Sequence, residues 1–124
     1  MVFDLLKPTL YVRVYRNRML IRELQAQREQ DVHASFSTER LLVGQFNEAR
    51  VALRQAIKLM LRGKWMSMAP TILVQPMEMT EGGLSQVEER IFHELGAGVG
   101  GRRVRVHIGD ELNDEAVRRQ LGGR

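Results

Sequence analysis

Glycines are the residues in this chain whose types and spacing come nearest to a chemical motif. Gly96, Gly98, Gly100 and Gly101 lie within six positions, and glycine-rich loops of this kind can cradle phosphate. A phosphate loop, however, follows a strand and opens a helix, so that helix N–H groups face the anion. Here the apolar pattern predicts a helix before the glycines and a strand after them. We therefore interpret 96–101 as a helix end with a tight return to a strand.

Other catalytic residue types are scattered. The histidines, His33, His93 and His107, are too far apart in sequence for a local metal motif. The chain has no cysteine, which excludes disulfides, thiolate nucleophiles and cysteine zinc sites. Its serines lack the G-x-S-x-G setting of a hydrolase nucleophile. We therefore expect no catalytic residue, no metal and no cofactor, and a protein that is not an enzyme.

Carboxylates gather in one stretch, at Glu78, Glu81, Glu88, Glu89 and Glu94. Several of them fall on a predicted helix, two near its N-terminus, where negative charge favours the helix. We interpret the stretch as a solvated acidic face.

Arginines supply the candidate interaction surface. Most of the 19 basic residues are arginines, a residue suited to bidentate and stacked contacts at interfaces. Nucleic-acid binders usually combine such cations with exposed aromatic rings, and Tyr11 and Tyr15, which alternate with Arg13, are the best stacking platform here. The candidate surface consists of Arg13, Arg16, Arg18, Arg102, Arg103 and Arg105.

Composition limits the classes of protein that fit. The 124 residues are 44% apolar and 27% charged, as in a single globular domain. A net charge of +4 permits binding to nucleic acid without arguing for it. No apolar run approaches the ~20 residues of a membrane span, and the N-terminus does not resemble a secretory signal. We expect one cytoplasmic domain over 1–124, with a lead-in segment over 1–7.

Apolar periodicity predicts the elements. Alternation over Leu10–Val14 and Met19–Leu24 predicts a hairpin that turns at Asn17, after which Gln25–Gln30 forms a polar connection. A weaker strand is expected near Val32–Phe36, followed by a helix from Phe46 that Gly63 caps and a buried strand over Pro70–Pro76. A Ser85–Glu88 capping box opens the next helix, which runs to about Leu95 with Val87, Ile91 and Leu95 on its inner face. A strand with Val104, Val106 and Ile108 alternating follows, and Asn113 or Asp114 caps a last helix.

Connection lengths predict the topology. The first three strands are joined by turns and should be antiparallel, whereas strands separated by helices should be parallel. We expect an α+β (α/β-like) fold with a mixed five-stranded sheet, in the order 3-2-1-4-5, and helices packed on it. The core should span 8–109, with a C-terminal helix and tail over 110–124.

The stretch from Pro70 to Gly109 resembles the bacterial actin homologues of the rod-shape-determining MreB/Mbl family. The matching segments are Val87-Glu88-Glu89-Arg90, Gly98-Val99-Gly100 and Arg102-Arg103-Val104, and Val43-Gly44 before the Phe46 helix is also similar. The resemblance covers about 8–109. It implies the first small subdomain of an actin-like, ribonuclease H-like fold, and a link to cell shape or the cytoskeleton.

The chain departs from that family where nucleotide would bind. The family's first hairpin carries an aspartate, a glycine and threonines that hold metal-bound phosphate, whereas Arg13–Arg18 holds no acid and no glycine. The second half of the actin fold does not fit in 124 residues. Of the family's positions that act on nucleotide, one matches here: Glu94 aligns with the glutamate that orients the attacking water. A lone glutamate cannot support hydrolysis without metal and phosphate in place.

The sequence therefore predicts a non-enzymatic, actin-like single-subdomain protein that acts through protein–protein contacts, with a second copy or a full-length actin-like homologue as partner. The alternative is a small basic nucleic-acid-binding domain. In a sheet of this order the third and fifth strands are the outer ones. We expect the third to be too short and weakly patterned to accept a partner, and the fifth to support weak, salt-sensitive self-association through Arg103 and Arg105, with the Glu78–Glu94 region of a second copy opposite them.

Overall fold

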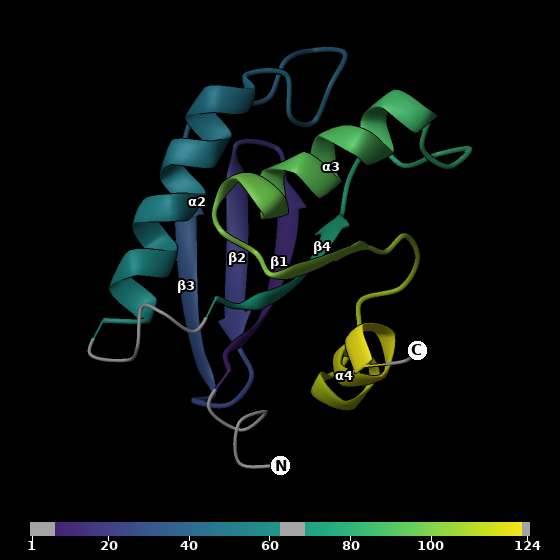
Figure 1. The fold of residues 1–124 in the computed structure, drawn as a ribbon. Helices are drawn as coiled ribbons and strands as arrows, with labels where there is room; N and C mark the ends of the chain where they lie inside the picture. Colours follow the sequence, from purple (N-terminus) through teal and green to yellow (C-terminus); the bar gives the residue numbers. More distant parts are fainter. Residues whose placement is uncertain (1–6, 63–68, 123–124) are drawn as a thin grey trace.

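A mixed five-stranded sheet forms the middle of the structure (Figure 1), a computed structural model that describes residues 7–62 and 69–122. The strand order is β3-β2-β1-β4-β5. Neighbours among the first three strands are antiparallel, and the β1–β4 and β4–β5 pairs are parallel. The predicted α+β fold with sheet order 3-2-1-4-5 is confirmed. In chain order the elements are β1 (Thr9–Tyr15), β2 (Arg18–Glu23), β3 (Arg28–His33), α2 (Phe46–Met60), β4 (Thr71–Pro76), α3 (Gln86–Gly98), β5 (Arg103–Val106) and α4 (Asp114–Gly122).

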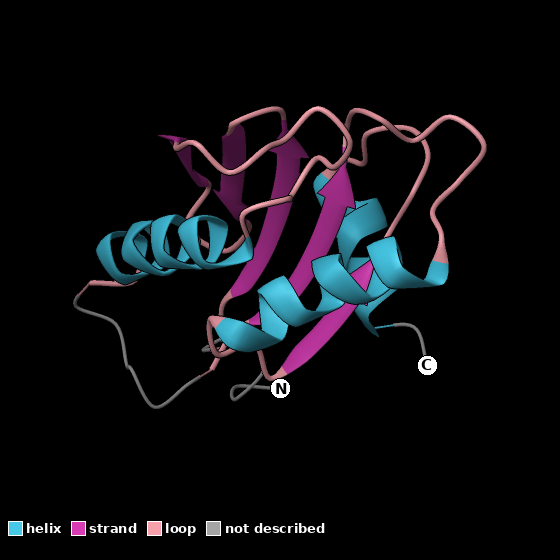
Figure 2. Ribbon diagram, turned by 90° about the horizontal axis from the view of Figure 1, so that it is seen from above, coloured by secondary structure: helices cyan, strands magenta, loops and turns pink. Residues whose placement is uncertain are grey.

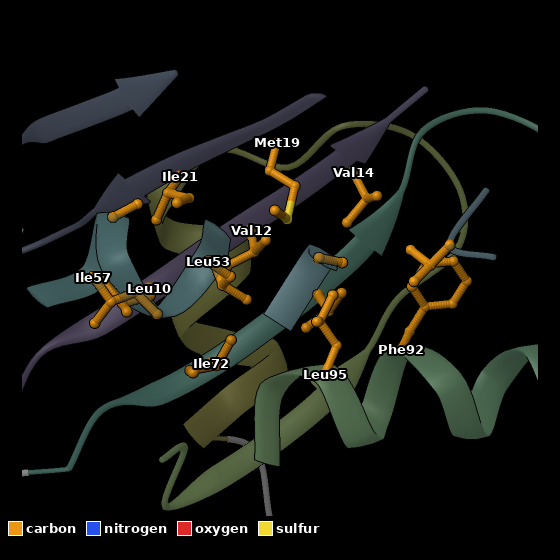
Figure 3. Close-up of a cluster of buried hydrophobic side chains, with 14 of the residues drawn as sticks. Leu10, Val12, Val14, Met19, Ile21, Leu53, Ile57, Ile72, Phe92 and Leu95 are labelled. Atoms are coloured by element: carbon orange, nitrogen blue, oxygen red, sulfur yellow. The ribbon is translucent and has the colours of Figure 1, made fainter. Parts of the chain in front are cut away.

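Two helices, α2 and α3, cover one face of the sheet (Figure 2). Alternate side chains of the strands point at them and form the main apolar core, as Figure 3 shows. Full burial of one such aliphatic side chain stabilises a fold by about 1.5–3 kcal/mol, so this layer is the main source of stability. Its members include Leu10, Val12, Val14, Met19, Ile21, Leu53, Ile57, Ile72, Phe92 and Leu95.

The C-terminal end of α2 is tied to the strands by one arginine. The guanidinium of Arg28, on β3, donates to the carbonyl oxygen of Met60 and to the carboxylate of buried Glu23. Leu61 follows as the cap residue, and the predicted cap Gly63 lies outside the described residues. Among residues 7–62 and 69–122, no helix is both long and apolar enough to cross a membrane.

Of the helices in residues 7–62 and 69–122, α4 alone packs on the opposite face of the sheet (Figure 2). Val117 and Leu121 of α4 pack against Tyr11, Leu24 and Leu73 in a second, smaller core. The helix begins as the sequence predicts, because Asn113 Oδ1 accepts a hydrogen bond from the amide of Ala116 at 2.8 Å. Much of this face, over β2 and β3, therefore has no helix above it.

The third strand differs from its prediction. It was expected near Val32–Phe36 after a polar connection, but β3 spans Arg28–His33 and includes part of that polar stretch. The reason is that Glu29, Asp31 and His33 lie on the open face of the sheet, where charged side chains keep their water. Strand pairing, rather than an apolar pattern, defines β3, and the strand is longer than β5.

The glycine run also differs in part. The helix continues through Gly98 rather than ending near Leu95, so the first glycines are helical. A Cβ on Gly96 would lie 2.7 Å from Val104 Cγ1, which means that glycine lets α3 approach β5 closely. The expected tight return is made by Gly100, whose φ is 95°.

Two expected core positions are wrong, although the Ser85–Glu88 capping box that opens α3 is confirmed. Val87 is 69% exposed, because the buried face of α3 is set by Phe92, Leu95 and Gly96. Ile108 is 42% exposed, because β5 ends at Val106.

Asn17 locks the β1–β2 turn to the loop after β3. Its φ is 54°, as its place in the turn predicts, and its Oδ1 accepts hydrogen bonds from the amides of Phe36 at 2.9 Å and Ser37 at 2.8 Å.

Asn17→Gly keeps the backbone conformation but removes both hydrogen bonds, so urea unfolding should show a loss of about 2 kcal/mol in the free energy of unfolding. Asn17→Asp, which retains the acceptor oxygen, should lose less than half as much; equal losses would show that these bonds contribute nothing.

Candidate interaction surface

The strand registers place four of the six candidate arginines on one face of the sheet. Side chains alternate along a strand, and the pairings of β1, β2, β4 and β5 put Arg13, Arg18, Arg103 and Arg105 on the face that also carries α4. Arg16 lies in the β1–β2 turn and Arg102 immediately before β5. The six residues nevertheless fall into three different environments.

Arg13 is internal. The residue is 5% exposed, and its guanidinium donates to Glu111 at 2.9 Å and to Glu29 at 3.1 Å. It also lies over the ring of Tyr11, 4.9 Å from the ring centroid. Tyr11, one of the two rings of the predicted stacking platform, is 1% exposed, so the prediction is wrong for that ring. The other ring, Tyr15, is half-buried and has the Arg18 guanidinium 5.0 Å from its centroid.

Tyr11 and Gln75 explain why that platform is covered. The Tyr11 hydroxyl donates to Gln75 Oε1 and accepts the amide of Leu112 at 3.0 Å. Gln75 Nε2 donates to the carbonyl oxygens of Gly109 at 2.8 Å and Asp110 at 3.2 Å. Burial raises the pKa of Tyr11, so the hydroxyl keeps the proton that it donates. These bonds hold the segment between β5 and α4 against the sheet.

A second anchor holds the start of α4. Arg22 Nε and Nη2 donate to the two carboxylate oxygens of Asp114 at 2.8 and 3.1 Å, and Gln27 Nε2 donates to the same group at 2.9 Å. The hydrogen bonds from Arg22 are the main cause that lowers the pKa of Asp114 to about 2. Asp114 also lies in the first turn of α4, where a negative charge is stabilised by the helix dipole.

The arginines near the hairpin turn are engaged as well. Arg18 Nε and Nη2 donate to the carboxylate of Asp31 at 2.9 and 3.1 Å, and this bonding lowers the pKa of Asp31. Arg16 Nη1 donates to the carbonyl oxygen of Thr38 at 2.9 Å, and the amide of Arg16 donates to Glu78 at 2.9 Å. Both side chains therefore have roles within the fold.

Arg102, Arg103 and Arg105 are different. All three are exposed at the outer strand of the sheet. Within the described part of the chain, their side chains form no hydrogen bond and no ion pair, whereas Arg13, Arg18 and Arg22 each form at least one ion pair. These three residues, called here the β5 cations, are the part of the candidate surface that is available to a partner.

The carboxylates of the acidic stretch, like the arginines, are partly engaged within the fold and partly unpaired among the described residues. Glu78 accepts the amide of Arg16, and Glu88 completes the capping box with Ser85. Glu94, the position that matches the actin-like family, is exposed and lies 3.6 Å from the guanidinium of Arg90. Glu81 and Glu89 are exposed and form no such contact among the described residues.

The histidines do not meet. His33 Nε2 lies 3.3 Å from Asp31 Oδ1, while His93 is on α3 and His107 follows β5. Over residues 7–62 and 69–122, no group of three or more histidine and acidic side chains is placed to hold a metal ion.

The other outer strand, β3, borders a depression of about 670 Å³ between that strand and α2. Val51 and Leu59 of α2 line it and are 44% and 55% exposed. On the opposite side of the strand, Glu29 and Asp31 are already paired with arginines. This edge therefore offers apolar surface, with Glu48 as an exposed carboxylate beside it.

Asp114→Asn should destabilise the protein by about 2 kcal/mol at pH 7, the free energy that corresponds to a carboxyl pKa of about 2 against the ordinary 3.8. Because the pKa is lowered in the folded state, this stabilisation is complete above pH 3.8 and is lost as the pH falls through about 2. Urea unfolding should therefore show the two proteins converging at low pH. Glu115→Gln, which removes an exposed pair with Arg119, is the control. A gap that persists unchanged to pH 2 would contradict this account.

Comparison with known proteins identifies one family. No family model matches the chain. The chain is 40% identical to the uncharacterized protein YjaA of Escherichia coli (strain K12) over 121 residues, an alignment that covers 90% of this chain and 95% of the relative. Identity at this level over nearly the full length of both proteins shows common descent, and the chain belongs to the YjaA family.

Proposed function

We propose that this protein is a non-enzymatic interaction module, built like one small subdomain of the MreB/Mbl actin homologues, that binds protein partners through the β5 edge. The observation that supports the proposal best is the state of the β5 cations. Arg102, Arg103 and Arg105 are exposed and unpaired within the described structure, whereas the arginines near the hairpin are engaged inside the fold.

The edge itself suits a selective partner. An outer strand presents N–H and C=O groups that another chain can pair with, and β5 is such a strand. Arg103 and Arg105 oppose nonspecific pairing with another strand because they place positive charge at this edge. A partner that offers matched carboxylates overcomes this opposition, and a second copy supplies Glu81 and Glu89. A full-length actin-like homologue is the other partner that this fold suggests, with a role in cell shape or the cytoskeleton.

The β1–β2 turn supports a function without nucleotide. In the actin-like family the corresponding hairpin receives phosphate. Here the amide of Arg16 is taken by the Glu78 carboxylate at 2.9 Å, and the amide of Asn17 by the Ser37 hydroxyl at 3.0 Å. A carboxylate on these donors repels a phosphate that would use them.

Nucleic-acid binding remains the alternative, and the β5 cations are the feature that favours it. The rest of the predicted basic surface does not contribute, because Arg13 is buried and Arg18 is paired. None of the aromatic residues in the described part of the chain is exposed enough to serve as an open stacking platform.

The charge of the β5 edge should control self-association. Sedimentation at low salt should show a weak oligomer that dissociates as salt screens the charges. Arg103→Glu/Arg105→Glu should abolish the oligomer at every salt concentration.

The matched control is Arg54→Glu/Lys58→Glu, which makes the same change of charge on exposed positions of α2 and should leave the oligomer intact. An unchanged distribution in the β5 variant would rule this surface out. Binding of single-stranded DNA or RNA at low salt, lost in the β5 variant, would instead favour the alternative function.

The adenosine part of ATP should not strengthen binding of the nucleotide to this protein. Because the hairpin turn is occupied, Mg-ATP should raise the melting temperature no more than Mg-pyrophosphate does, and specific binding to the folded state would have to raise it. Glu94→Gln should leave both responses unchanged. A shift with Mg-ATP that Mg-pyrophosphate does not reproduce would overturn the proposal of a function without nucleotide.

A further inference from the structure

We propose that a basic depression at the start of the parallel strands binds a small polyanion of the pyrophosphate class. The depression has a volume of about 410 Å³. Its floor and walls include the first residues of β1, β4 and β5, which are Thr9, Thr71 and Arg103. Lys7, Arg102 and Arg118 complete its charged lining.

The four cations reach this place from separate parts of the chain. Lys7 precedes β1, Arg102 and Arg103 lie at the start of β5, and Arg118 is on α4. Among residues 7–62 and 69–122, no acidic residue lines the depression, and none of the four side chains forms an ion pair. Like charges held together without an acid are unfavourable in the free protein. A bound anion removes that repulsion.

A hydroxyl donor faces the same space. Gln25 Nε2 donates to Thr9 Oγ1 at 3.0 Å, and Thr71 Oγ1 lies 3.5 Å from the same oxygen. Since Thr9 Oγ1 accepts in these contacts, its own hydrogen is left to donate. The hydrogen can turn toward Thr71 Oγ1 over this long contact or toward an anion in the depression. Arginine forks, an ammonium group and a free hydroxyl together match the many oxygens of a multiply charged phosphate group.

Size and lining favour a small ligand over a nucleic acid. No aromatic ring of the described residues lines the depression, so these residues offer the bases of a single strand nothing to stack on. The depression is also separate from the hairpin turn where an actin-like protein would hold phosphate. Thr9 and Tyr15 are the two ends of β1, and a strand of this length separates its ends by about 20 Å.

Calorimetric titration with inorganic pyrophosphate, at low salt and without divalent metal, tests this site. Arg102→Gln/Arg118→Gln should weaken binding at least about tenfold, a loss of about 1.4 kcal/mol. Arg54→Gln/Lys58→Gln removes the same charge from α2 and should leave the affinity unchanged. Equal weakening in both variants would show nonspecific attraction and overturn the proposal.

Two further measurements separate this site from its alternatives. Thr9→Val keeps a β-branched residue in the strand, so weaker pyrophosphate binding with an unchanged melting temperature would support the hydroxyl's role. Single-stranded DNA that binds more tightly than pyrophosphate, with the same dependence on Arg102 and Arg118, would overturn the choice of a small ligand. Arg105 does not line the depression; Arg105→Glu should therefore weaken self-association but retain pyrophosphate binding, so that either proposal can fail without the other.

Discussion

The buried polar layer around Arg13 is the interaction on which the second face of this fold depends. Burying a guanidinium is costly unless its charge is paired and its hydrogen bonds are made. Glu29 and Glu111 provide the pairing, and the Tyr11 ring lies beneath the cation. Since Glu111 belongs to the segment after β5, the ion pair between Arg13 and Glu111 forms only when that segment lies on the sheet. The buried Nε of Arg13 has no hydrogen-bond partner among the described residues. Gln75 and Arg22 then hold the same segment and the start of α4.

This layer also decides which charges remain outside. Arginines lie on strands β1, β2, β3 and β5. Those on β1 and β2 form ion pairs, two of which join segments far apart in sequence. At β5 the pattern changes, because α3 covers one side of the strand and no further strand of the described residues pairs with its outer edge. Of two arginine clusters in the sequence, at 13–18 and 102–105, the second is the one that stays unpaired in the described structure. Both proposed sites draw on that remaining charge.

The sequence predicted the elements whose side chains have a one-sided apolar pattern. The buried positions of α2, from Ala49 to Met60, recur at helical spacing, and the alternation in β1 and β2 reflects a covered face. The apolar pattern gave wrong predictions where strand pairing or close packing, rather than a one-sided apolar face, sets the element. β3 has charges on its open face, and Gly96 is helical because α3 must approach Val104 closely.

Of the candidate surface, the residue types were predictable but their partners were not. Arg13 and Arg103 lie on the same face of the sheet, and both alternate with apolar residues along their strands. Their different roles come from Glu111, which lies 98 residues from Arg13 in the chain. A buried glutamine in the apolar strand β4 was the available signal, because Gln75 had to find polar partners on a segment that covers it.

The central claim is that contacts form at the β5 edge and not at the hairpin or at β3. Amide chemical shifts followed by NMR through a dilution series at low salt test it residue by residue. Concentration-dependent shifts should appear at 102–106 and, on the acidic side of the contact, near Glu81 and Glu89, while the amides of Arg16, Asn17 and Arg18 stay constant. Shifts centred on β3 and on Val51 and Leu59 of α2 would contradict the account, because they would show that the apolar edge is the one that binds.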